Sequence, residues 1–78
     1  MTRIHFNMTN IEIQEQIQLK ASDLLKGPPE LLEAMGERAS DAAKSVAYFR
    51  DLGDKDRVRY EMREFLRWLE KMQSEYNI

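Results

Sequence analysis

The chain contains no cysteine among its 78 residues, and it has only one histidine and one tryptophan. Without cysteine, disulfides and cysteine-type zinc sites are excluded, and we expect a reducing compartment, the cytoplasm. The lone histidine, His5, cannot build a multi-histidine metal site. No apolar run approaches the roughly 18 residues that a membrane-spanning helix needs. We therefore expect no metal, no cofactor and no membrane partner.

A strong charge of one sign is also missing. Residues 1–27 are neutral, residues 28–53 carry −2, and residues 54–78 balance six basic against six acidic groups, which gives the formal net charge of −2. Proteins that hold nucleic acid mainly by charge are strongly basic. The charge distribution therefore does not favour nucleic acid as the partner.

The length predicts a single small domain, residues 1–78. A chain of this size buries only about 60–65% of its unfolded surface, so its stability margin is thin. Small domains without disulfides or metals often recover that margin by oligomerising, and we expect a homodimer.

The spacing of apolar residues predicts an all-α fold. We expect three helices, at about 10–26, 29–52 and 55–76. Thr9 and Glu12 form a capping box before the first helix, and Gly27 is the expected residue that ends it. Gly53 should end the second helix and Asp54 should cap the third. The turn between them is so short that these two helices must form a long antiparallel hairpin.

Each helix of the hairpin carries an apolar residue every three or four positions, which is the pattern of a packed helix–helix seam. The predicted seam consists of Leu32, Met35, Ala39, Ala42, Val46 and Phe49 on one helix and Val58, Met62, Phe65, Leu69, Met72 and Tyr76 on the other. The first helix should pack against this hairpin through Ile13, Ile17 and Leu24.

A row of small residues, hereafter the small-residue row, runs beside the seam. It consists of Gly36, Ser40, Ala43 and Ala47. A smooth row of this kind lets another helix approach closely. Two occupants are possible: helix 10–26 of the same chain, or a helix of a second protomer or foreign partner.

The third helix also carries basic residues at strict four-residue spacing, hereafter the basic row. They are Lys55, Arg59, Arg63, Arg67 and Lys71. Arg59 and Arg67 have acidic residues three or four positions away, whereas Arg63 has none. Arg63 and its neighbours Arg59 and Arg67 are therefore the candidate partner contacts, against the alternative of a solvated helix face.

Residues 2–8 alternate apolar and polar side chains, which predicts a short extended segment. This segment is either irregular and packs Ile4 and Phe6, or a strand that pairs with the same segment of a second protomer. An extended segment before a capped helix and a second helix resembles the ribbon-helix-helix DNA binders, over residues 2–49. That resemblance implies that Arg3, His5 and Asn7 would read DNA in a dimer. The chain departs from that family in its long second helix, its added third helix and its acidic balance.

No catalytic arrangement stands out. Carboxylate pairs such as Glu61 and Glu64 lie in highly charged stretches where nothing indicates a pKa shift useful for acid–base work. No serine has a histidine or lysine placed to activate it. We therefore expect a non-enzymatic interaction module that binds and modulates another protein, as inhibitors, antitoxins, adaptors and phage-type host-modifying proteins do. The alternatives are a dimeric DNA-binding regulator using residues 2–8 and an oligomer that sequesters a small phosphate-containing ligand at the basic groups.

Overall fold

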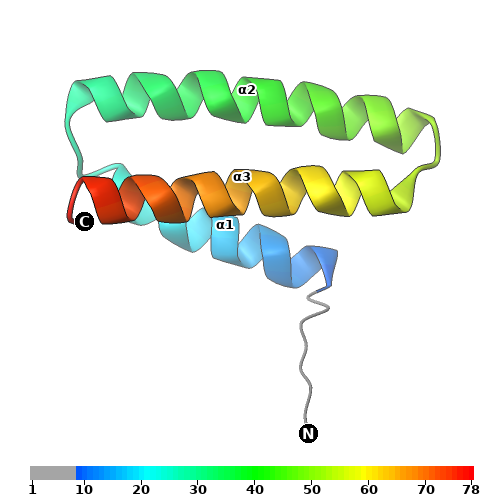
Figure 1. Cartoon of the computed structure of the whole chain (residues 1–78), viewed down its shortest axis with the longest axis horizontal. Coiled ribbons are helices and arrows are strands. Elements are labelled where there is room, and N and C mark those ends of the chain that lie inside the picture. The colour runs from blue at the N-terminus through cyan, green and yellow to red at the C-terminus, as the bar shows by residue number, and fades with distance from the viewer. Residues whose placement is uncertain (1–8) are drawn as a thin grey trace, which may run out of the picture.

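The computed structural model describes residues 9–78, which form three α-helices and no strand (Figure 1). These are α1 (Asn10–Leu24), α2 (Pro29–Asp51) and α3 (Lys55–Glu75). The all-α prediction is confirmed, and each helix ends one or two residues before the predicted boundary. Within residues 9–78, no helix combines the length and apolarity that crossing a bilayer requires.

The third helix is the centre of the fold. It packs against α2 on one side and α1 on the other, whereas α1 and α2 barely touch each other. Figure 1 shows α2 running antiparallel to α3, and α1 running in the same direction as α3. The predicted α2–α3 hairpin is therefore present, with α1 packed on its α3 side.

Local signals set the ends of the helices as predicted. The Thr9 hydroxyl accepts from the Glu12 amide at 3.1 Å, and the Glu12 carboxylate accepts from the Thr9 amide at 2.8 Å. The Asp54 carboxylate accepts from the Arg57 amide at 3.1 Å and begins α3. Gly53 has a φ of +75° and lets the chain reverse after α2, a conformation that glycine adopts without a steric penalty.

The prediction that Gly27 ends the first helix is wrong, because α1 ends at Leu24, three residues earlier. Gly27 does not adopt a positive φ; instead, it lies where other side chains leave no space. A Cβ at this position would lie 2.6 Å from Cδ2 of Leu31 and 2.9 Å from Cδ1 of Ile78. The glycine is therefore needed for packing, because it lets the connection between α1 and α2 pass close to the C-terminus.

Two apolar clusters hold the helices together. One is centred on Ile13, Val58, Met62 and Leu66, and the other on Leu24, Leu31, Met35 and Leu69. Both contain residues of α1 and α3, and Ile17 packs against each of them. The first cluster therefore joins α1 mainly to α3, while the second joins all three helices near the α1–α2 connection.

The predicted seam is right for α3 at Val58, Met62 and Leu69 but is wrong at three positions. Leu31 is fully buried, whereas Leu32 is 38% exposed. Ala39 and Tyr76 are exposed as well. The reason is that α1 contributes Leu24 to the cluster beside Leu31, which rotates the buried face of α2 away from the one that an isolated two-helix hairpin would use.

Candidate interaction surface

The arginines of the basic row lie on the outward face of α3. Each follows a buried residue of the core in the sequence: Val58, Met62 and Leu66 precede Arg59, Arg63 and Arg67. Successive helical residues are rotated by about 100°, because 3.6 residues complete a turn, so the same helix buries one stripe and exposes the next. All three arginines are exposed.

Only one of these arginines forms an ion pair with a described residue. Nη1 of Arg67 lies 3.5 Å from Oε2 of Glu64, with the Arg67 side chain 71% exposed. An exposed pair of this kind contributes about 0–1 kcal/mol. Arg59 forms no ion pair with Asp56, although the spacing allowed one, and Arg63 forms none with any residue in 9–78. Two guanidinium groups therefore remain available on this face.

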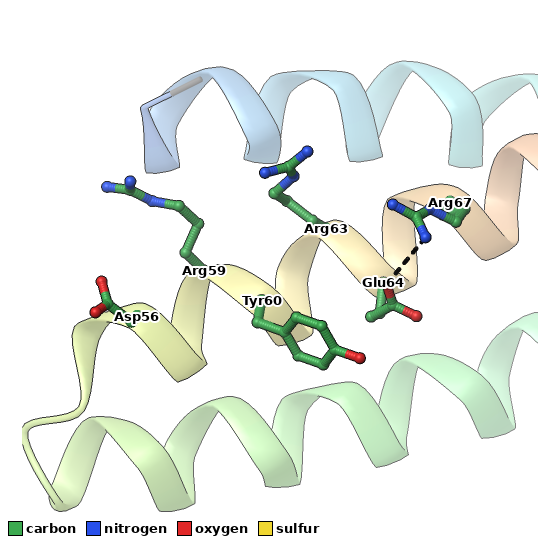
Figure 2. A pocket seen from close by; sticks show the side chains of 6 residues that line it. All are labelled: Asp56, Arg59, Tyr60, Arg63, Glu64 and Arg67. Carbon is green, nitrogen blue, oxygen red and sulfur yellow. Dashed lines mark ion pairs between the residues drawn. The ribbon is translucent and has the colours of Figure 1, made fainter. Parts of the chain in front are cut away.

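The arginines border a shallow, open depression of about 400 Å³. Its lining consists of Asp56, Arg59, Tyr60, Arg63, Glu64 and Arg67. Figure 2 shows Arg59 and Arg63 extending to the same side of α3, with Tyr60 on the other side. Tyr60 is half exposed, so the depression offers cations and an aromatic surface together. That combination suits a partner with carboxylates beside apolar groups.

A further aromatic contact was not expected from the sequence. The Arg57 guanidinium lies 5.0 Å from the ring centre of Phe49 and 5.8 Å from that of Tyr60. Such contacts are worth about 0.5–1 kcal/mol at exposed sites. Because Phe49 belongs to α2, this contact ties the two helices together beside their turn and helps to place Tyr60. The four-residue spacing of the basic row excludes Arg57, so that pattern could not reveal the contact.

A second open surface lies between α1 and α2, and we call it the interhelix groove. Its volume is about 220 Å³, and its lining is mainly apolar. It is lined by Gln14 and Ile17 of α1, Ala39, Ala42, Ala43, Val46 and Arg50 of α2, and Met62 and Phe65 of α3. The groove exists because α1 and α2 both pack on α3 and barely touch each other.

The small-residue row is not covered by α1. Gly36, Ser40, Ala43 and Ala47 are all exposed, and a Cβ added at Gly36 would meet nothing within 4 Å. Ala43 also lines the interhelix groove. The alternative in which α1 docks on this row is therefore wrong, because Ile13 is buried against α3 instead.

The structure does not bring the two predicted surfaces together. The depression at the basic row and the groove beside the small-residue row share no lining residue. The third predicted surface, Arg3, His5 and Asn7, lies outside the described residues, as does the prediction of an extended segment at 2–8. Within residues 9–78, no three potential metal ligands gather at one place.

Comparisons of this chain with protein-family models, with curated proteins and with solved structures find no significant match.

Proposed function

We propose that this protein is a non-enzymatic interaction module that binds an acidic surface of another protein through Arg59, Arg63 and Arg67. The proposal includes a homodimer as the working form, the cytoplasm as the place of action, and modulation of the partner as the outcome. The observation that carries it is the unpaired state of Arg59 and Arg63 among the described residues, on the outward face of a well-packed helix.

The packing of α3 supports this role. The helix contacts both other helices, so its outward side chains project from a backbone that is held on two sides. A partner that binds such a surface orders only side chains, which lowers the entropic cost of association. Arginine also forms two parallel hydrogen bonds with one carboxylate, so a row of arginines at four-residue spacing can recognise an acidic helix face.

A protein partner is favoured over nucleic acid by the surrounding charge. Asp56 and Glu64 line the same depression as the three arginines, which leaves only a small local excess of positive charge. A polyanionic backbone would be repelled by these carboxylates, whereas a protein surface with a few acidic residues can avoid them. The alternative of an oligomer that sequesters a phosphate-containing ligand is tested separately, with inorganic phosphate as the probe.

The test compares the wild type with the double variant Arg59→Glu/Arg63→Glu. Tagged protein is used to capture partners from the native cell, and captured proteins are identified by mass spectrometry. Parallel titrations use a labelled glutamate-rich helical peptide, inorganic phosphate and a DNA duplex at low and high salt. We expect the double variant to lose the captured protein and to bind the acidic peptide at least about tenfold more weakly.

The matched control is Lys26→Glu/Lys44→Glu, which reverses the same number of charges at exposed positions outside the basic row. This variant should capture the partner as the wild type does, and circular dichroism should show equal helix content in all proteins. Capture that is unchanged in the double variant would reject the basic row as the binding surface. Binding of phosphate or DNA that is stronger than binding of the acidic peptide would replace the proposal with the corresponding alternative.

A further inference from the structure

One exposed face of α2 has no helix packed on it among the described residues, although Ala43 and Arg50 at its edge also line the interhelix groove. Six exposed positions follow one another at spacings of three or four residues: Glu33, Gly36, Ser40, Ala43, Ala47 and Arg50. This spacing is that of a helix–helix seam. The set of six adds Glu33 before the small-residue row and Arg50 after it.

The positions are arranged evenly about a point midway between residues 41 and 42. If a second α2 lies antiparallel with a two-fold axis at that point, Ser40 faces Ala43 of the other copy and Gly36 faces Ala47. Glu33 then faces Arg50, and this pair occurs twice because the contact is symmetrical. A two-fold contact requires such self-complementarity, whereas a foreign helix would not require it.

We infer that two copies of this chain form a dimer through α2, packed antiparallel with Glu33 of each copy opposite Arg50 of the other. The inference deepens the homodimer part of the proposed function and assigns it a surface and a register.

The charges at the two ends of the seam support this pairing. Glu33 has no basic residue three or four positions away, and Asp54, four positions after Arg50, instead accepts a hydrogen bond from the Arg57 amide and forms no ion pair with Arg50. Neither forms an ion pair with any residue in 9–78. Antiparallel pairing would supply each with an opposite charge, while parallel pairing would place Glu33 against Glu33. The charge pattern therefore selects both the partner and its direction.

The small side chains support close packing in the middle of the seam. Glycine, serine and alanine let two helix axes approach to about 8 Å, the short end of the usual range. The face between residues 33 and 50 is about 26 Å long at 1.5 Å per residue. Leu32 is 38% exposed and flanks the seam on the groove side, so an additional apolar side chain lies beside the contact.

The experiment measures molar mass over a concentration series by light scattering and sedimentation equilibrium. The proteins are wild type, Glu33→Arg, Arg50→Glu, and the double variant carrying both changes. We expect the wild type to dimerise and each single variant to dimerise at least about tenfold more weakly, because two attractive pairs become repulsive. The double variant should regain dimerisation, since both pairs are restored with their signs exchanged.

Mixing the two single variants tests the same register a second time. Equal amounts of Glu33→Arg and Arg50→Glu should form a heterodimer, because each copy then offers the charge that the other needs. Asp41→Arg is the matched control, since it alters an exposed acid of α2 outside the seam. This control should leave the dimer unchanged.

Cross-linking adds a readout that does not depend on charge. The chain has no cysteine, so Ser40→Cys/Ala43→Cys introduces the only thiols and should form an intermolecular disulfide on mild oxidation. The control Asp41→Cys/Lys44→Cys has the same spacing on a neighbouring face of α2 and should not form an intermolecular disulfide.

A wild type that stays monomeric at high concentration would overturn the inference. A dimer that is indifferent to both single charge variants, or strengthened by Glu33→Arg, would also overturn it, because another surface or a parallel alignment would then be in use. Arg59→Glu/Arg63→Glu should remain dimeric. Partner binding by the basic row is measured by capture, and dimerisation through α2 is measured by molar mass, so the two proposals can fail independently.

Discussion

The two helices of the hairpin are similar in length but use their surfaces differently. α3 has 21 residues and buries four of them, Val58, Met62, Leu66 and Leu69. α2 has 23 residues and buries only Leu31 and Met35. Because α3 contacts both neighbours and α2 contacts mainly one, the fold is organised around α3. The longer α2 therefore retains a wide exposed face, which is the face that we assign to a second copy.

The largest expected effect compares buried and exposed leucines on the two helices. Leu69→Ala in α3 should destabilise the fold by about 2–5 kcal/mol, because Leu69 is fully buried and its removal leaves a cavity. Leu32→Ala in α2 should cost less than about 1 kcal/mol, because this side chain already contacts water. Urea unfolding followed by circular dichroism measures both. Equal losses would mean that α2 buries the face containing Leu32, as the apolar spacing predicts.

An intermediate effect compares Gly27, in the connection between α1 and α2, with Gly36, inside α2. Gly27→Ala should destabilise by about 1–3 kcal/mol, because its new methyl group would overlap Leu31 and Ile78. Gly36→Ala should stabilise by about 0.5–1 kcal/mol, because the helix gains a better helix former in open space.

Thermal unfolding at a protein concentration low enough to keep the chain monomeric measures both changes without interference from the α2 face. The opposite signs are the test: a destabilising Gly36→Ala in the monomer would show that another element of the same chain covers the small-residue row.

The smallest expected effect concerns surface charge. Glu64→Gln removes the Arg67–Glu64 ion pair of α3 and should cost no more than about 0.5 kcal/mol, with the difference vanishing at high salt. Glu37→Gln on α2 removes an exposed acid that forms no ion pair with a described residue, so it serves as the control. A larger loss for Glu64→Gln would mean that this pair also holds α3 in place.

Much of the fold could be predicted because its determinants are local. The Thr9–Glu12 capping box, the Asp54 cap and the positive φ of Gly53 each depend on residues within one turn of one another. The exposure of the arginines of the basic row follows from the same periodicity that buries the core face of α3. Arg57 over Phe49 could not be read from a spacing rule, because it depends on how two helices meet at their turn.

The sequence by itself determined three helices, their caps and the antiparallel return between α2 and α3, since hydrogen bonds and steric limits within a few residues decide these features. Only the tertiary structure decided that α1 packs on α3, that Leu31 rather than Leu32 is buried, and that Gly27 is needed for space. These outcomes depend on which apolar faces compete for the same neighbour. Because α3 packs against both other helices, α1 does not cover the small-residue row, and this face of α2 stays exposed.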